Sequence, residues 1–133
     1  MAVFDTFALV KFLKKEAGWE KVDKALQEGG YISDATLYEL LYVCARDFLD
    51  QGYNLHESTR KAREIVTSFM VHLKGQFLSD QVRSEAVYFK IKYNRLNLSH
   101  FDCLALATAK TLNEPLFSGE KGLAQTKEVR VLG

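Results

Sequence analysis

The sequence predicts an α/β fold, a three-layer α/β/α domain in which helices cover both faces of a central parallel sheet of four to five strands. Short apolar segments alternate with longer amphipathic ones along the 133 residues, and hydrophobic residues make up 47% of the composition. No Pro- or Ser-rich linker and no internal repeat interrupts this pattern. A chain of this length can bury one core, so we expect a single domain over residues 1–133.

Five short apolar segments have the composition of buried strands and are too short to be helices. In order, we expect strands at residues 2–4, 31–33, 76–78, 115–118 and 129–132. Because helical segments separate them, the strands should run parallel, with helices on both faces of the sheet.

Amphipathic segments between the strands predict the helices, since their apolar residues recur at intervals of three and four. In order, we expect helices at about residues 6–13, 19–26, 34–51, 56–73, 80–93 and 101–112. Ser33 or Asp34 should cap the third helix, and Gly75 breaks the pattern after the fourth. The last helix carries little polar surface, so we expect it to be buried at the centre of the domain.

The charge balance argues against a global positive field as the basis for binding nucleic acid. Eighteen Lys and Arg residues oppose 17 Asp and Glu residues, so any such binding must come from a local basic patch. The candidates for that patch are Lys11, Lys14, Lys15, Arg60, Lys61, Arg63, Lys90, Lys92 and Arg95. Solvated helix faces explain these residues equally well, and Phe89 and Tyr93 among them match an apolar core stripe better than a stacking platform.

Cys44 and Cys103 lie in apolar helical segments and have neither Cys-x-x-Cys spacing nor His-rich surroundings. We therefore expect reduced thiols in the core. The sequence has no basic segment followed by a long apolar stretch near Met1, and no run of about 18 uncharged apolar residues. We expect a cytoplasmic protein that does not associate with membranes.

Four carboxylates lie close in sequence to the predicted strand ends. Asp5 directly follows the first strand, and Glu39 lies early in the helix after the second. Asp102 begins the buried helix before the fourth strand, and Glu120 follows that strand. Ligands of an open parallel sheet bind beyond the carboxyl ends of the strands, where the strand order reverses, so these acids are the candidate site residues.

Each acid also has a purely structural explanation. Asp5 could cap a helix, Asp102 could form a capping box with Ser99, Glu39 could be a solvated helix residue, and Glu120 a loop residue. Gathered at one sheet edge, however, they would repel one another, and a divalent cation would offset that repulsion. Oxygen ligands without accompanying His or Cys suit Mg²⁺ or Mn²⁺ better than structural zinc.

Four segments resemble the PIN-domain family, particularly its single-domain VapC-like members. They are Val3-Phe4-Asp5-Thr6, the acid-bearing segment 32–40, the helix 98–109 with its third acid, and Pro115-Leu116-Phe117-Ser118-Gly119-Glu120. Their order and spacing together are more specific than any one of them. The sequence departs from the family at Glu120, where Asp is more usual, and at Cys103, where a small residue is common.

The resemblance implies a flavodoxin-like reversal of strand order and cleavage of single-stranded RNA. It implies that Asp5, Glu39 and Asp102 hold Mg²⁺ or Mn²⁺. Glu120 then joins the catalytic residues and helps to place a second ion or the attacking water. It could bind metal through a water molecule or make no contact with metal. Thr6 and Ser118 are expected to orient the carboxylates through hydrogen bonds. Lys121, next to Glu120, is the basic residue expected closest to the substrate.

The resemblance also implies a homodimer and, for VapC-like members, neutralisation by a cognate antitoxin, so we expect the toxin of a toxin-antitoxin pair. Tyr31, Tyr38 and Tyr42 could belong to a dimer surface, although partial burial explains them equally well. Two alternative functions remain. One is a catalytically weak PIN-like binding module in RNA processing. The other is a Mg²⁺-binding receiver-like regulatory domain, although no adjacent pair of acids ends the first strand.

Overall fold

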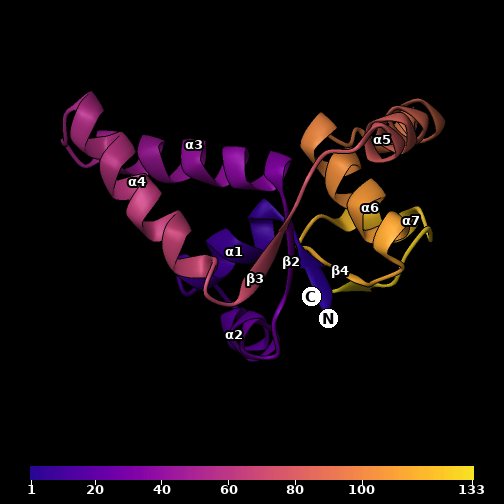
Figure 1. Ribbon diagram of the computed structural model, residues 1–133, viewed down its shortest axis with the longest axis horizontal. Helices are drawn as coiled ribbons and strands as arrows, with labels where there is room; N and C mark the ends of the chain where they lie inside the picture. Colours follow the sequence, from indigo (N-terminus) through magenta and orange to yellow (C-terminus); the bar gives the residue numbers. More distant parts are fainter.

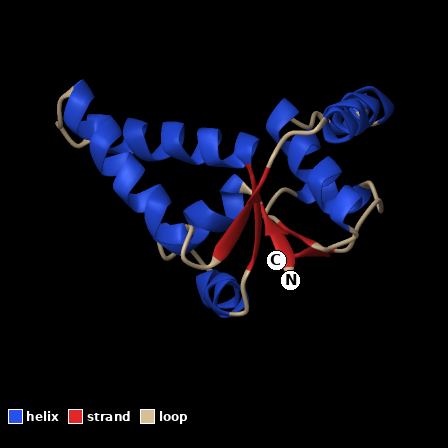
Figure 2. Ribbon diagram, viewed as in Figure 1, coloured by secondary structure: helices blue, strands red, loops and turns tan.

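The computed structural model describes residues 1–133 and shows helices on both faces of one parallel sheet (Figures 1 and 2). The strands are β1 (Ala2–Phe4), β2 (Gly30–Ser33), β3 (Leu73–Gln76), β4 (Leu116–Phe117) and β5 (Val131–Leu132). All four neighbouring pairs are parallel, and the order in the sheet is β3-β2-β1-β4-β5. The predicted fold class is therefore confirmed.

The strand order reverses between β1 and β4. The chain adds β2 and β3 on one side of β1 and then returns to place β4 and β5 on the other side. The expected reversal is present, but the order 3-2-1-4-5 differs from the flavodoxin-like order 2-1-3-4-5. A binding site is consequently expected beyond the carboxyl ends of β1 and β4, the two strands at the reversal.

The helices are α1 (Thr6–Leu13), α2 (Trp19–Gln27), α3 (Asp34–Asp50), α4 (Leu55–Phe69), α5 (Asp80–Lys92), α6 (His100–Leu112) and α7 (Lys121–Gln125). Polar N-cap side chains start most of them, with Ser33 before α3, Asn54 before α4, Ser79 before α5 and Ser99 before α6. Each cap accepts a hydrogen bond from a backbone N–H of the first turn, which would otherwise lack a partner inside the helix. None of the helices has the length and apolar character needed to cross a membrane.

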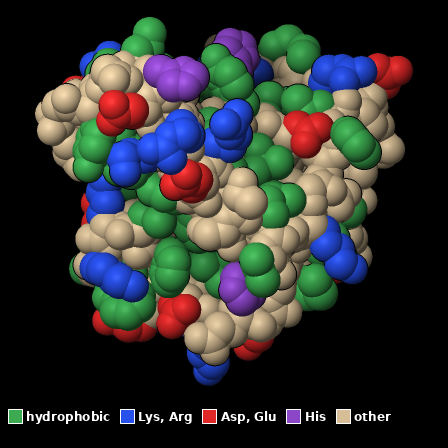
Figure 3. Space-filling view, turned by 60° about the vertical axis from the view of Figure 1, so that its left-hand side comes forward, with side chains coloured by type: hydrophobic (Ala, Val, Ile, Leu, Met, Phe, Trp, Pro, Cys, Tyr) green, Lys and Arg blue, Asp and Glu red, His purple; other side chains and the backbone are tan.

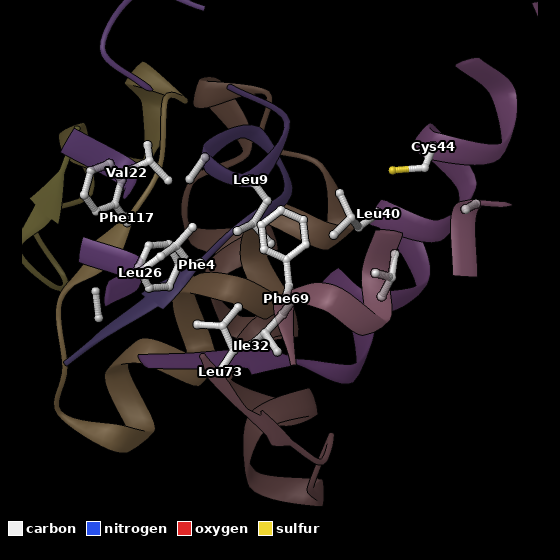
Figure 4. Packing of buried hydrophobic residues seen from close by; sticks show 14 residues of the cluster. Phe4, Leu9, Val22, Leu26, Ile32, Leu40, Cys44, Phe69, Leu73 and Phe117 are labelled. Carbon is white, nitrogen blue, oxygen red and sulfur yellow. The ribbon is translucent and has the colours of Figure 1, made fainter. Parts of the chain in front are cut away.

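Alternating strand residues divide the core into two layers. On one face Phe4 and Phe117 stack with ring centroids 5.6 Å apart, and Ile32 and Leu73 continue the layer beneath α1 to α4 (Figure 4). On the other face Val3 and Leu116 pack with residues of α5, α6 and α7. Figure 1 shows the two helical groups on either side of the sheet.

The buried positions of the predicted core helix and of both cysteines are confirmed. Cys44 is 6% exposed and Cys103 is 1% exposed, and both are free thiols. Phe89 is 1% exposed and belongs to the core, as its place on the apolar stripe predicts. Because both thiols are buried, the candidate reactive groups are the polar side chains at the edge of the sheet.

The third strand was predicted too far along the chain. The strand occupies Leu73–Gln76 rather than 76–78, and Gly75 pairs with Ile32 inside it instead of ending a helix. Leu73 follows Phe69 by four residues, so helical periodicity alone does not separate the end of α4 from the start of β3. Phe77, predicted in the strand, is 88% exposed.

Two short elements were not predicted. Helix α7 spans only five residues, and the 3₁₀ turn Asn94–Leu96 follows α5 directly. Such elements are too short to display helical periodicity. Helix α7 matters for the site because Glu120, expected in a loop, is its N-cap residue.

Candidate active site

Asp5 occupies the carboxyl end of β1, where its backbone N–H donates to the carbonyl of Phe117 on β4 at 3.1 Å. Its side chain caps α1, since Oδ1 accepts a hydrogen bond from the Ala8 N–H at 2.9 Å. The residue is only 3% exposed, and Oδ2 is buried without a hydrogen-bond partner. The structural role as a cap is thus real, yet it uses only one of the two carboxylate oxygens.

Glu39 lies in the second turn of α3, and its half-buried side chain reaches the first residue of α1. The Thr6 hydroxyl, at the start of α1, donates a hydrogen bond to Glu39 Oε1. Thr6 itself is 7% exposed, so the contact joins two elements that the β1–β2 pairing brings side by side. The expected role of Thr6 in orienting a carboxylate therefore has a defined geometry.

Asp102 lies in the first turn of α6 and forms the capping box expected with Ser99. Its Oδ2 accepts from the Ser99 N–H at 2.9 Å, and its own N–H donates to Ser99 Oγ at 3.0 Å. Asp102 is 9% exposed. The structural role in the capping box and a role in the site are compatible, because the capping box fixes the Asp102 carboxylate at the edge of the sheet.

Glu120 is held by the turn that follows β4. Its N–H donates to Ser118 Oγ at 2.9 Å, and its Oε1 accepts from the Gly122 N–H at 3.1 Å. Ser118 is 4% exposed, and its own N–H donates to the Leu132 carbonyl on β5 at 3.0 Å. Ser118 therefore positions the Glu120 backbone, while the side chain of Glu120 caps α7.

The carboxylates affect one another's pKa values, which indicates that they lie near one another. The pKa of Asp5 is raised to about 7, chiefly by burial and to a lesser extent by the charges of Asp102 and Glu39, against the lowering effects of the Ser118 hydroxyl and the Ala8 N–H. Burial also raises the pKa of Glu39, as does the charge of Asp102. Burial and the charge of Glu120 raise the pKa of Asp102. The four predicted acids thus lie close enough to repel one another.

Comparison with family models matches the model described as the PIN domain to residues 2–129.

The chain belongs to the PIN domain family.

Solved structures with the same fold support this assignment of the PIN domain. A chain of VapBC2 from Rickettsia felis, bound to a promoter DNA fragment, is 14% identical with a TM-score of 0.72 and covers 98% of this chain and 96% of that one. VapC20 of Mycobacterium tuberculosis, a toxin that cleaves the sarcin-ricin loop, is 13% identical with a TM-score of 0.71 and coverage of 98% and 99%. A toxin-antitoxin complex from Klebsiella pneumoniae gives 19% identity, a TM-score of 0.68 and coverage of 100% and 97%.

At these identities the likeness to solved structures shows the fold alone. A search of curated proteins finds no match to this PIN domain.

The donor set of this PIN domain fits a hard divalent cation, although its side chains do not converge on one point. No group of three or more His, Cys, Asp and Glu residues is arranged to hold a metal ion. Each carboxylate is instead turned to a donor of its own, Thr6 for Glu39, Ser99 for Asp102 and Gly122 for Glu120. The unpartnered Oδ2 of Asp5 and the raised pKa values nevertheless mark a buried excess of negative charge that a cation would neutralise.

Few of the predicted basic residues lie near the carboxylates of the PIN domain. Lys90, half-buried on α5, donates to the Leu98 carbonyl, and its charge opposes the rise in the pKa of Asp102. Lys11 Nζ lies 3.8 Å from the position that a Cβ on Gly119 would occupy, beside the turn that carries Glu120. Lys121 is exposed in that same segment.

Other basic residues are engaged elsewhere. Lys14 pairs with Asp47 at 3.2 Å, Arg60 with Glu64 at 2.7 Å, and Lys92 with Glu128 at 3.0 Å. Figure 3 shows basic side chains of one face mixed with acidic and hydrophobic ones. The local basic patch is therefore narrower than the sequence predicted.

One feature of the site escaped the sequence analysis. The rings of Tyr38 and Phe101 stack with centroids 6.3 Å apart and planes 12° apart. Each aromatic residue immediately precedes an acid of the site, Glu39 or Asp102, and this adjacency was the available signal. Tyr38 is 65% exposed and Tyr42 is 59% exposed, so partial burial does not account for these two tyrosines.

Proposed function

We propose that this PIN domain is a metal-dependent endoribonuclease that hydrolyses phosphodiester bonds of single-stranded RNA. The observation that supports it best is that Asp5, Glu39, Asp102 and Glu120, from four separate segments, lie near the carboxyl edge of the sheet beside the reversal and raise one another's pKa values. A structural role alone does not account for Asp5, because its buried Oδ2 has no partner.

Asp5, Glu39 and Asp102 are the residues that would hold Mg²⁺ or Mn²⁺. Such an ion, when bound, lowers the pKa of a water molecule and stabilises the charge that develops on phosphate oxygens. Glu120, whose Oε1 also accepts from the Gly122 N–H, would accept a proton or a hydrogen bond from the attacking water. The chain has no Ser, His and Asp arrangement in this site that would supply a nucleophile instead.

The surrounding residues keep the carboxylates in position. The Thr6 hydroxyl restrains Glu39, and the Ser99 N–H restrains Asp102. Without a cation, a proton on Asp5 relieves part of the repulsion, since its pKa is about 7. Lys11 and Lys121 lie beside the Glu120 turn and are suited to contact the RNA phosphates on either side of the cleaved bond.

We also propose a biological role as the toxin of a toxin-antitoxin pair, acting in the cytoplasm as a homodimer and neutralised by a cognate antitoxin. Several solved structures with this fold are toxin-antitoxin complexes, including those from Klebsiella pneumoniae and Rickettsia felis. The chain covers 96–97% of those matched chains, so the likeness spans the whole domain. A small neighbouring gene that encodes a DNA-binding antitoxin would support this role.

Of the two alternative functions, one is excluded and the other remains as a second candidate. The receiver-like domain is excluded, because the family match is to the PIN domain and the strand order is 3-2-1-4-5 rather than 2-1-3-4-5. A PIN domain that binds RNA-processing partners without catalysis is the second candidate, favoured by the absence of three converging metal ligands. Such a degenerate site should bind Mn²⁺ poorly.

The proposed activity is tested by incubating the purified chain with a mixed pool of structured and single-stranded RNAs in Mg²⁺, Mn²⁺ or EDTA. The control is an Asp5→Asn variant shown by circular dichroism to be folded. Cleavage of single-stranded RNA that requires metal and is lost in the variant supports the proposal. Cleavage that persists in EDTA, or that the variant retains in full, would refute it.

A further inference from the structure

An exposed aromatic stack borders the candidate active site. Tyr38 on α3 is 65% exposed, and its ring lies nearly parallel to that of the half-buried Phe101 on α6. With ring centroids 6.3 Å apart, Phe101 packs in an offset stack against one side of the Tyr38 ring. Burial cannot be the reason for this arrangement, because most of Tyr38 remains in solvent.

The stack spans the two helices that carry the central acids. Tyr38 directly precedes Glu39 on α3, Phe101 directly precedes Asp102 on α6, and the stacked rings join the N-terminal halves of these two helices. A ligand on the open face of Tyr38 therefore binds beside the N-terminal halves of α3 and α6, the two helices that carry these carboxylates. A second protein chain docked there would cover the acids, whereas a flexible polynucleotide would bring a phosphate to them.

A groove leads away from the stack between α3 and α4. It has a volume of about 340 Å³, and its walls include Tyr38, Leu41, Tyr42, Thr59 and Arg63. Arg63 is exposed and forms no ion pair within the chain, although Arg60 on the same helix is paired with Glu64. An apolar floor with an unpaired cation on its wall matches the apolar base and anionic phosphate of a nucleotide.

We propose that Tyr38, backed by Phe101, stacks on one unpaired base of single-stranded RNA, while Arg63 contacts a phosphate further along the groove. This inference rests on the proposed ribonuclease function and specifies how its substrate is held. Stacking on a ring requires only the π-face that every base has, so Tyr38 supplies affinity and register rather than sequence specificity. The RNA strand then runs from the carboxylates over Tyr38 and into the groove between α3 and α4.

The test measures RNA binding without cleavage. A fluorescently labelled 12-nucleotide single-stranded RNA is titrated in Mg²⁺ with the full chain carrying Asp5→Asn, and the dissociation constant is obtained from anisotropy. Adding Tyr38→Ala should weaken binding roughly 5- to 150-fold, the range for loss of one aromatic–base stack. Tyr38→Phe keeps the ring and should bind as the parent does. Tyr88→Ala is the matched control, because Tyr88 on α5 is 55% exposed and lies outside the groove.

A scan with abasic nucleotides identifies the stacked base. One abasic position should weaken binding of the parent about as much as Tyr38→Ala does, and the two changes together should cost no more than either alone. Sedimentation measures the oligomeric state of the same variants. Two outcomes would overturn the inference. One is that Tyr38→Ala dissociates a dimer, which would show that Tyr38 contacts protein. The other is that Tyr38→Ala weakens binding by the same factor whichever nucleotide is abasic, which would show that Tyr38 contacts no base.

The two proposals fail in different ways. RNA binding that is the same in the parent and in Tyr38→Ala overturns the base-stacking inference and leaves the ribonuclease function intact. No metal-dependent cleavage of single-stranded RNA by the wild-type chain refutes the proposed function itself. Weaker binding by Tyr38→Ala, retention by Tyr38→Phe and Tyr88→Ala, and one abasic position that is not additive with Tyr38→Ala together establish the stack.

Discussion

Replacing Asp5 with Asn should make the metal-free protein more stable at pH 8, although the substitution removes a candidate active-site residue. Asp5 is 3% exposed, and its Oδ2 has no hydrogen-bond partner. Asparagine keeps an oxygen that can accept from the Ala8 N–H, and it is as good a helix cap as aspartate. The variant therefore loses a buried charge while it retains the cap of α1.

The magnitude follows from the pKa of Asp5, which burial raises from 3.8 to about 7. Because the folded state binds this proton more tightly than the unfolded state, ionisation penalises folding. The penalty is absent below about pH 4, grows between the two pKa values and is complete above about pH 7. At about 1.4 kcal/mol per tenfold change in proton affinity, it reaches about 4 kcal/mol. Burial of the amide group costs about 1–3 kcal/mol, so we expect a net gain of about 1–3 kcal/mol at pH 8.

Urea denaturation followed by circular dichroism, in EDTA at steps from pH 4 to pH 8, measures this difference. The variant should be no more stable than the wild type at pH 4 and progressively more stable as the pH rises. Saturating Mn²⁺ should reverse the order, since a ligand at about 100 times its dissociation constant stabilises by about 2.7 kcal/mol and only the wild type should bind it well. A variant that is less stable by the same amount at every pH would refute the reasoning.

Three further predictions concern single contacts. Thr6→Val should lower kcat/KM for RNA cleavage about 10- to 100-fold, because it frees Glu39, with a loss of only about 1 kcal/mol in urea denaturation. Phe4→Ala should lower the free energy of unfolding by about 3–5 kcal/mol in the same assay, because Phe4 is 0% exposed. Glu128→Gln should cost about 1–2 kcal/mol at pH 7. Hydrogen bonds from Tyr93, Lys92 and Lys110 outweigh burial and lower the pKa of Glu128, so this loss should shrink as the pH falls through that lowered pKa.

Local chemistry explains why much of the fold was predictable from the sequence. Ser33, Ser79 and Ser99 each cap a helix three residues before the N–H that they accept from, a signal contained within four residues. The start of β3 was not predictable in this way, because Leu73 fits both the periodicity of α4 and a strand. Leu73 belongs to the strand because it pairs with Gly30 on β2, and that contact joins residues that are distant in sequence.

The same distinction applies to the candidate site. Asp5, Glu39, Asp102 and Glu120 follow the predicted strands closely enough to be selected, and their mutual effects on pKa indicate that they lie near one another. Their use as ligands stays a prediction. Side-chain orientation depends on contacts between elements, so neither the Thr6–Glu39 hydrogen bond nor the Tyr38–Phe101 stack follows from sequence spacing.

Calorimetric titration of the purified chain with Mn²⁺ at pH 7 tests the central claim most directly. The account predicts that Mn²⁺ binds, that binding releases protons because Asp5 has a pKa of about 7, and that Asp102→Asn weakens it at least tenfold without unfolding the protein. Repeating the titration in buffers of different ionisation enthalpy counts the released protons. Wild-type binding that is no tighter than that of Asp102→Asn would contradict a metal site at these carboxylates and favour a PIN domain that only binds partners.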